Sequence, residues 1–249
     1  MKPHILYLMP GTVSKGPLGV GELARRSDIL AAWVGDRARV EVADLKEGAG
    51  TIECFSDEAL SVSPTVARVR QAVGTGVSAI IIGCYADTAL EAAREISPGP
   101  VIGPAQASMH YAAMLGERFS ILTVVPSVVP MIRRLVRLYD MKSRVGSILP
   151  IGLTVVDLAK AQQESYRRLL DHGRKAIEED GADTLILGCM SMSFQPQLAE
   201  ELQGELGVPV LNPARIAIDI AISLCNQNLS HSGRAYPLQP ADAFASLRS

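Results

Sequence analysis

A stretch that ends in Gly-Cys occurs twice in this chain and limits its fold more than any other feature. Residues 76–85 read GVSAIIIGCY and residues 181–190 read GADTLILGCM, so Cys84 and Cys189 occupy the same place in both copies. A short aliphatic run bounded by glycines is typical of a parallel strand that is covered on both faces. The repeat therefore predicts two buried strands, each followed directly by a cysteine.

The similarity between the two halves extends on both sides of these strands. Downstream, residues 100–115 (PVIGPAQASMHYAAML) match residues 209–224 (PVLNPARIAIDIAISL). Upstream, residues 5–10 (ILYLMP) match residues 121–126 (ILTVVP). Because three landmarks recur in the same order, we expect two related α/β halves.

Apolar periodicity predicts that strands and helices alternate along each half. The expected strands are 4–9, 39–42, 77–82, 101–102, 119–125, 144–149, 184–187 and 208–211. The expected helices are 18–34, 57–73, 87–96, 106–115, 128–138, 156–180, 197–206 and 214–225. Such alternation is typical of parallel sheets with helices on both faces. The predicted fold class is α/β, with two pseudosymmetric lobes and the active site in the cleft between them.

Composition excludes several classes of function. The 24 basic and 26 acidic residues give a formal charge of −2, and aromatic residues make up 4% of the chain, which argues against nucleic-acid binding. The first nine residues do not resemble a signal peptide, and no apolar run reaches membrane-spanning length. Four widely spaced cysteines without a CxxC pair indicate reduced thiols, a cytoplasmic location and no structural zinc site.

Both Gly-Cys pairs fall at the expected carboxyl ends of parallel strands, where α/β sheets bind their ligands. A free thiol has a pKa of about 8.5, which falls near helix N-termini. We expect the glycines to let backbone N–H groups approach a bound anion. Two thiols on opposite sides of one carbon could invert it without a cofactor, because one removes a proton and the other returns one. Cys54 and Cys225 have no counterpart in the repeat, so we interpret both as packing residues.

Other polar residues are weaker candidates for the site. Thr12 and Thr123 lie at matching strand ends and could bind a carboxylate or amide, or cap a turn. Asp87 is expected to be the N-cap of the helix after Cys84, and His110 a core histidine. The predicted substrate-binding residues are Pro10, Thr12, Tyr85, Ala86, Thr123, Met190 and Ser191.

Four segments carry a resemblance to a known family. They are residues 51–60 (TIECFSDEAL), residues 83–87 (GCYAD), residues 100–115, and residues 188–192 (GCMSM). With these, the chain resembles the Asp/Glu/hydantoin racemase superfamily from about residue 4 to 224, and most closely its hydantoin and allantoin racemase branch.

The resemblance implies a cofactor-independent enzyme of two lobes, whose substrate lies between residues matching Cys84 and Cys189. It also helps to assign the last helix to the first lobe. The expected divisions are a first lobe of residues 1–115 plus 216–235, a second lobe of residues 116–215, and a C-terminal arm or tail of residues 236–249.

The chain departs from the family pattern at two loops. Hydantoin-type members usually carry Asn-Pro-Asn-Thr after the first strand, where this chain has Met9, Pro10, Gly11 and Thr12. The common Gly-Cys-Ala-Gly-Met is replaced by the bulkier residues 188–192. The superfamily also includes maleate isomerases with two cysteines and arylmalonate decarboxylases with one. A cysteine pair disfavours the decarboxylase but does not separate a racemase from an isomerase.

The predicted function is a cofactor-independent racemase or epimerase that acts on a small hydantoin-like or amino-acid-derived substrate. The alternatives are a maleate-type cis–trans isomerase, a cytoplasmic small-ligand-binding protein, and a redox protein that forms a Cys84–Cys189 disulfide. No metal, nucleic acid or membrane partner is expected, and the protein is expected to be a homo-oligomer.

Overall fold

Two parallel four-stranded sheets form the framework of the protein. The computed structural model describes residues 2–240. The first sheet has the order β2-β1-β3-β4 and the second the order β6-β5-β7-β8. The strands are β1 (His4–Leu8), β2 (Arg39–Ala43), β3 (Ala79–Ile82), β4 (Val101–Ile102), β5 (Phe119–Thr123), β6 (Val145–Pro150), β7 (Thr184–Leu187) and β8 (Val210–Leu211). Both sheets repeat one topology, so the predicted α/β fold with two pseudosymmetric lobes is confirmed.

The register of the central strands is also the same in both sheets. Leu8 is paired with Ile82 in the first sheet, and Leu122 with Leu187 in the second. Each pair of strands has one further backbone hydrogen bond. The N–H of Gly83 donates to the carbonyl of Leu8, and the N–H of Gly188 donates to the carbonyl of Leu122, both at 2.7 Å. The cysteine follows next in both lobes, so the two thiols start from equivalent positions.

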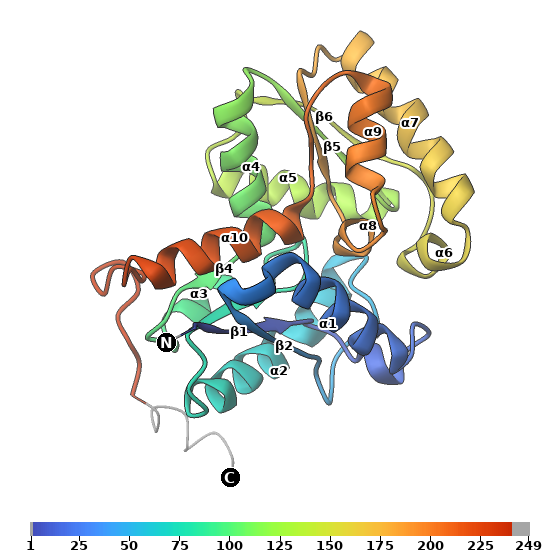
Figure 1. The fold of residues 1–249 in the computed structure, drawn as a ribbon. Coiled ribbons are helices and arrows are strands. Elements are labelled where there is room, and N and C mark those ends of the chain that lie inside the picture. The colour runs from blue at the N-terminus through green and yellow to red at the C-terminus, as the bar shows by residue number, and fades with distance from the viewer. Residues whose placement is uncertain (1, 241–249) are drawn as a thin grey trace.

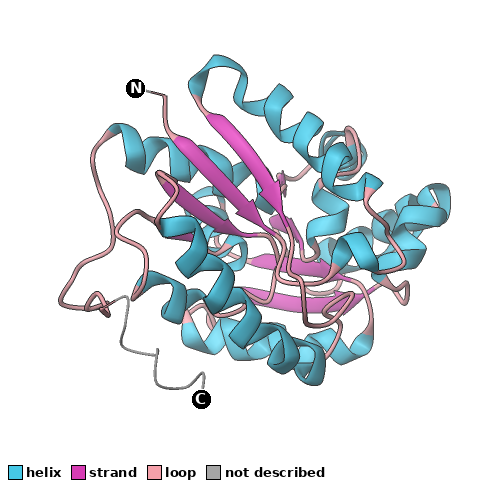
Figure 2. Cartoon of the chain, turned by 90° about the horizontal axis from the view of Figure 1, so that it is seen from below, coloured by secondary structure: helices cyan, strands magenta, loops and turns pink. Residues whose placement is uncertain are grey.

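Helices cover both faces of each sheet (Figure 2). They are α1 (Gly21–Val34), α2 (Phe55–Val73), α3 (Leu90–Arg94), α4 (Pro104–Leu115), α5 (Val129–Leu138), α6 (Val155–Lys160), α7 (Gln162–Glu178), α8 (Met190–Ser193), α9 (Leu198–Leu206) and α10 (Pro213–Asn226). Short 3-10 turns are Val13–Lys15, Gly35–Arg37 and Pro126–Val128. The expected helix 156–180 is two helices, because the backbone of Ala161 leaves the helical region between α6 and α7.

Side chains along β1 and β3 alternate between two cores. Ile5 and Ile81 pack with α1 and α10, whereas Leu6 and Ile80 pack with α2 and α3. Both faces of these strands are therefore buried, which explains why their sequences are continuous aliphatic runs rather than alternating polar and apolar residues.

Two helices cross between the lobes. α4 follows the last strand of the first sheet but buries Met109 in the core of the second sheet, beside β7. α10 follows the last strand of the second sheet but buries Ile218 in the core of the first. Figure 1 shows α10 running across the boundary between the sheets. The lobes 1–115 plus 216–235 and 116–215 stay a proposal. By this division α4 belongs to the first lobe, although its buried face packs in the core of the second sheet.

The chain after α10 returns along the first lobe (Figure 1). Ser230 donates its hydroxyl to the carbonyl of Pro98 at 2.8 Å, and the N–H of Gln239 binds the carbonyl of Glu95 at 2.8 Å. Of the expected arm, residues 241–249 lie outside the described residues. Within residues 2–240, the structure contains no helix with the length and hydropathy needed to cross a membrane.

Two sequence predictions about polar residues are wrong. Asp87 has a left-handed backbone (φ 50°) and does not cap the helix after Cys84. Its carboxylate instead accepts the N–H groups of Ala105 and Gln106, at 3.0 and 2.9 Å, and so caps α4. His110 is exposed rather than in the core, and its Nδ1 lies 2.8 Å from the carbonyl of Gln106.

Candidate active site

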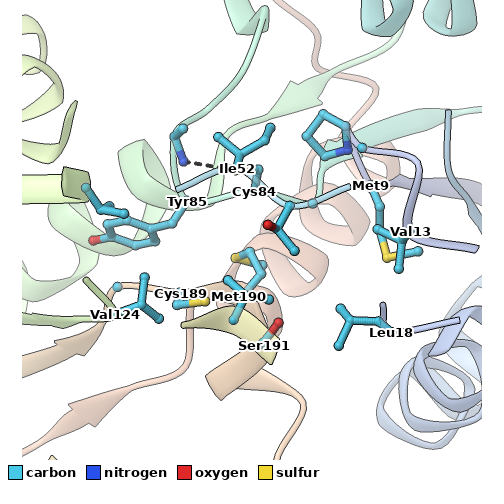
Figure 3. A pocket seen from close by; sticks show the side chains of 18 of the residues that line it. Met9, Val13, Leu18, Ile52, Cys84, Tyr85, Val124, Cys189, Met190 and Ser191 are labelled. Atoms are coloured by element: carbon cyan, nitrogen blue, oxygen red, sulfur yellow. Dashed lines mark hydrogen bonds between the residues drawn. The ribbon is translucent and has the colours of Figure 1, made fainter. Parts of the chain in front are cut away.

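A pocket opens at the carboxyl ends of the strands of both sheets. It encloses about 720 Å³, including the part that is open to solvent. Its lining residues come from five loops and their neighbouring helices: Met9, Pro10, Gly11, Val13, Leu18, Arg26, Gly50, Thr51, Ile52, Gly83, Cys84, Tyr85, Ala86, Val124, Val128, Met131, Ile132, Val155, Gly188, Cys189, Met190 and Ser191. Figure 3 shows Cys84 and Tyr85 on one side of the pocket, and Cys189, Met190 and Ser191 on the other.

The glycine before each cysteine is required by packing. A Cβ atom on Gly83 would lie 2.5 Å from the ring of Tyr7, and one on Gly188 would lie 2.5 Å from Ile121. The N–H groups of both glycines bind the adjacent central strand. The N–H groups of the two glycines themselves are therefore not available to a bound anion. The Gly-Cys pair instead allows the loop to leave the sheet tightly against its neighbour.

Cys84 is half-buried, and its sulfur accepts the backbone N–H of Ala86 at 3.4 Å. Burial raises the pKa of the Cys84 thiol to about 12, although this N–H and the hydroxyl of Thr88 act in the opposite direction. Desolvation penalises the thiolate more strongly than two donors stabilise it. The thiol is therefore the resting form of Cys84.

Cys189 is buried at the start of α8. Burial also raises the pKa of this thiol, but three groups oppose the effect: the backbone N–H groups of Ser191 and Met192, and the positive charge of Arg26. The two sulfurs thus occupy equivalent places in the fold but different electrostatic surroundings. Only Cys189 has a cation among the causes that shift its pKa.

The other two cysteines lie outside the pocket lining. Cys54 precedes α2, and Cys225 lies in α10, where its thiol is 3.8 Å from the carbonyl of Ser78. All four cysteines are free in the structure.

Five of the seven predicted substrate-binding residues line the pocket, namely Pro10, Tyr85, Ala86, Met190 and Ser191. Thr12 and Thr123 do not. The hydroxyl of Thr12 points to the carbonyl of Ala49 at 3.4 Å, and that of Thr123 donates to the carbonyl of Gly188 at 3.1 Å. Thr123 is fully buried, so it fixes the loop that carries Cys189 rather than facing a ligand.

Arg26 is the main residue that sequence reasoning missed. It comes from α1 and is 4% exposed. Its Nε donates to Glu22 at 2.7 Å, and its Nη2 donates to the hydroxyl of Ser191 at 3.1 Å. Arg26 shares a buried stripe with Leu30 and Val34. A charged residue on the buried stripe of a helix was the signal available in the sequence.

Apolar residues from the second lobe form one wall of the pocket, and sequence reasoning missed these as well. They are Val124, Val128, Met131, Ile132 and Val155. A loop of the first lobe reaches this wall, because Ser127 donates its hydroxyl to the carbonyl of Glu53 at 2.7 Å and the Glu53 carboxylate accepts the N–H of Val155. The polar connection between β2 and α2 therefore closes the cleft at its rim.

No group of three or more His, Cys, Asp or Glu side chains in residues 2–240 is arranged to hold a metal ion. Among the lining residues, the groups that can transfer or stabilise a proton or a charge are two thiols, one guanidinium, hydroxyls and backbone N–H groups. This set suits the transfer of a proton to and from a carbon acid, since a thiol can act as either base or acid.

Known proteins resemble this chain in sequence and in fold. A hydantoin racemase from Rhizobium meliloti is 39% identical over 174 residues, which cover 70% of this chain and 71% of that protein. A hydantoin racemase from a Pseudomonas species is 37% identical over 167 residues, and the match spans 67% of this chain and 66% of that protein, just under two thirds of its length. The structure of an allantoin racemase from Klebsiella pneumoniae superposes with a TM-score of 0.86 at 29% identity, over 98% of each chain.

A family model described as Asp/Glu/Hydantoin racemase matches residues 24–221. The match includes both Gly-Cys loops, the second sheet and most of the first. Together with the 39% identity to a hydantoin racemase, this match establishes that the chain belongs to the Asp/Glu/hydantoin racemase family.

Proposed function

We propose that the protein is a cofactor-independent racemase or epimerase that inverts a carbon next to a carbonyl group. One observation carries the proposal: two cysteines at the same position of an internal repeat line one pocket from opposite lobes. Packing alone gives no reason for a matched pair of thiols in a pocket. The names of the relatives support a hydantoin-like substrate, because two are hydantoin racemases and one is an allantoin racemase.

Inversion requires one thiolate and one thiol in the same site. The thiolate removes the proton from one face of the carbon, and the opposite thiol delivers its own proton to the other face. Neither sulfur needs to form a bond to carbon, and each cysteine is the base in one direction and the acid in the other. Positioned acid–base groups of this kind typically contribute about 10²–10⁴-fold to a rate.

The negative charge that develops on the carbonyl oxygen needs hydrogen-bond donors. The nearest candidates are backbone N–H groups in the loops at Tyr85–Ala86 and Met190–Ser191, which border the pocket on both sides. Loss of one such donor typically costs about 10²–10³-fold in rate. We therefore assign to these loops both the placement of the thiols and the stabilisation of the enolate.

The pocket wall also favours a substituent on the substrate. Val128, Met131 and Ile132 offer an apolar surface near the thiols, which would bury an apolar group next to the reacting carbon. We propose a 5-substituted hydantoin with an apolar side chain as the first substrate to test. A cytoplasmic location and a homo-oligomeric assembly remain proposals that accompany this function.

The test uses single enantiomers in heavy water. Single enantiomers of hydantoins with apolar 5-substituents, of allantoin and of acidic amino acids are incubated with the protein after dialysis against EDTA. Maleate, which is achiral, is incubated separately. A racemase loses optical rotation and takes up one deuterium at the stereocentre. Geometric isomerisation of maleate would identify the cis–trans isomerase instead. Binding of a hydantoin without deuterium uptake would contradict the proposal and favour a ligand-binding protein.

A further inference from the structure

Two arginines of α1, both bound to Glu22, reach from the first lobe to the segment that follows Cys189. Glu22 accepts hydrogen bonds from both Arg25 and Arg26, so the cluster keeps one net positive charge. Arg26 binds the hydroxyl of Ser191, and Arg25 binds the carbonyl of Phe194 at 2.8 Å. The Arg26 guanidinium also lies over the Phe194 ring, 4.7 Å from its centre. Two guanidinium groups thus hold the segment directly after Cys189.

The same cluster has no counterpart around Cys84. Among the lining residues of the described chain, 2–240, Arg26 is the one charged side chain. The carboxylate that acts on Cys84 is that of Asp87, and its charge disfavours a negative sulfur. The repeat therefore supplies two equivalent cysteines, whereas α1 supplies a cation to one of them.

We propose that Arg26 is a positioning residue: when the site carries one thiolate, Arg26 places that negative charge on Cys189 rather than on Cys84. The inference rests on the proposed two-thiol function, and it names the residue that makes the two thiols unequal. Arg26 acts in two ways. Its charge faces the Cys189 side of the pocket, and its bond to Ser191 holds the turn whose N–H groups point to the sulfur.

The charged and titratable groups around Cys189 support this direction. Arg26 lies on one side, whereas the Glu53 carboxylate, the Cys84 thiol and the Tyr7 hydroxyl face the site from the loop after β2, the loop after β3, and β1. The Tyr7 hydroxyl is fully buried, and burial raises its pKa, so it stays neutral. Glu53 repels a thiolate, but its carboxylate is held by the N–H of Val155 at the rim. Arg26 is the group that favours the charged sulfur.

The inequality has a chemical consequence. The form of the site with a Cys189 thiolate and a Cys84 thiol accepts the enantiomer whose proton faces Cys189. After one turnover the proton is on Cys189 and the charge is on Cys84, so the site must exchange a proton with solvent or react with the opposite enantiomer. The ratio kcat/KM cannot reveal this asymmetry. Two enantiomers have equal free energies, which forces kcat/KM to be the same in both directions at every pH.

The test therefore titrates each thiol without a substrate. Cys54 and Cys225 are replaced by Ser, and Cys84→Ser or Cys189→Ser then leaves one pocket thiol. The ultraviolet absorbance of the thiolate is followed against pH in each variant. We expect a lower midpoint for Cys189 than for Cys84. Arg26→Met should raise the Cys189 midpoint by about one to two pH units, the usual effect of losing a close opposite charge.

Arg25→Met is the matched control. It removes the same charge from the neighbouring residue, which also binds Glu22 but is 44% exposed and does not line the pocket. We expect it to move the Cys189 midpoint by less than about 0.5 pH units, since exposed charges are screened by solvent. Arg26→Lys keeps the positive charge, so its Cys189 midpoint should stay close to that of the parent. In the two-thiol protein, Arg26→Met should also slow alkylation of Cys189 by iodoacetamide about three- to tenfold. A higher pKa makes each thiolate more nucleophilic, but it lowers the fraction of Cys189 that is thiolate by a larger factor.

A wider pocket in Arg26→Met would speed alkylation, so access cannot mimic the expected result. If Arg26→Met does not fold by circular dichroism, Glu22→Gln/Arg26→Met removes the carboxylate that has lost one of its two arginine partners, and it carries the same expectation. Equal shifts in the Arg25 and Arg26 variants, or a lower midpoint for Cys84, would overturn the assignment. Because no substrate is used, a negative hydantoin assay with a shifted Cys189 midpoint would count against the proposed function alone.

Discussion

At the scale of single residues, two thiols with the same sequence context differ in their surroundings. Cys84 is flanked by Asp87, which disfavours its thiolate, and Cys189 by Arg26, which favours it. Burial opposes the charged form of both. A pair of buried thiols is nevertheless useful to a racemase, because weak acidity leaves the proton on the thiol that must act as the acid.

Serine substitution of either pocket cysteine should nearly abolish inversion, by about 10²–10⁴-fold, because a serine hydroxyl is a far weaker acid than a thiol. Cys84→Ser and Cys189→Ser should each still exchange the α-proton of one enantiomer with solvent, through the surviving thiol. We expect the two variants to prefer opposite enantiomers. The measurement is deuterium uptake by each pure enantiomer, followed by mass spectrometry.

Cys225→Ser is the control for this pair, since Cys225 is half-buried and lies outside the pocket lining. It should keep the parent rate within about twofold, and all three variants should keep the parent circular dichroism. Racemisation near the parent rate by either pocket variant would show that two thiols are not needed.

At the scale of elements, the short helix α8 holds Cys189 in place through one aromatic residue. Phe194 directly follows α8, is 1% exposed, and packs in the core of the first lobe. Its ring stacks on Trp33 and meets Tyr7 edge-on, with both centroids 5.5 Å away. An element of the second lobe is therefore anchored in the first, beside the pocket.

Phe194→Ala should lower the free energy of unfolding by about 3–5 kcal/mol, the usual cost of removing a buried aromatic ring. It should also lower turnover, because the turn after Cys189 loses its anchor. Phe55→Ala is the control: Phe55 is 45% exposed, and its loss should cost less than about 1 kcal/mol. Urea unfolding and the heavy-water assay measure both effects. Equal losses of stability in the two variants would contradict the anchoring role.

At the scale of the whole molecule, polar contacts join the lobes around the cleft. Glu58 in α2 pairs with Arg134 in α5 at 2.5 Å, and the hydroxyl of Tyr139 donates to Asp87 at 2.7 Å. Asp87 is 4% exposed and also caps α4, so one carboxylate connects the loop after Cys84 to both lobes. Burial raises the pKa of Asp87 to about 6, against the effect of these hydrogen bonds.

This pKa predicts a pH dependence of stability. The folded protein holds the Asp87 proton up to about pH 6, whereas the unfolded chain loses it near pH 4. The free energy of unfolding therefore falls as the pH rises from about 4 to about 6. The contribution of Asp87 should decrease by up to about 3 kcal/mol across this window. Asp87→Asn, which stays neutral, should remove this fall. Urea unfolding of both proteins at pH 4 to 7 gives the difference, and a constant difference would disprove the assignment.

The sequence by itself determined the repeat, the two parallel sheets and the position of a cysteine after a central strand of each. These features depend on local patterns: an aliphatic run that must be buried on both faces, and a Gly-Cys pair at its end. The two halves fold by the same local rules, so a match in sequence was enough to predict a match in topology.

The tertiary structure alone decided which residues join the cysteines. Arg26 reaches the pocket from a helix that ends 155 residues before Cys189 (189 − 34), and Asp87 caps a helix that begins 17 residues later (104 − 87). Thr123, at the predicted strand end, turns to the carbonyl of Gly188 instead. Contacts of this kind are fixed by the exchange of α4 and α10 between the lobes and by the burial of charge. The periodic pattern of α1 marks Arg26 as a charged residue on a buried stripe, but it does not identify the partner, because that depends on which surfaces meet after the elements have formed.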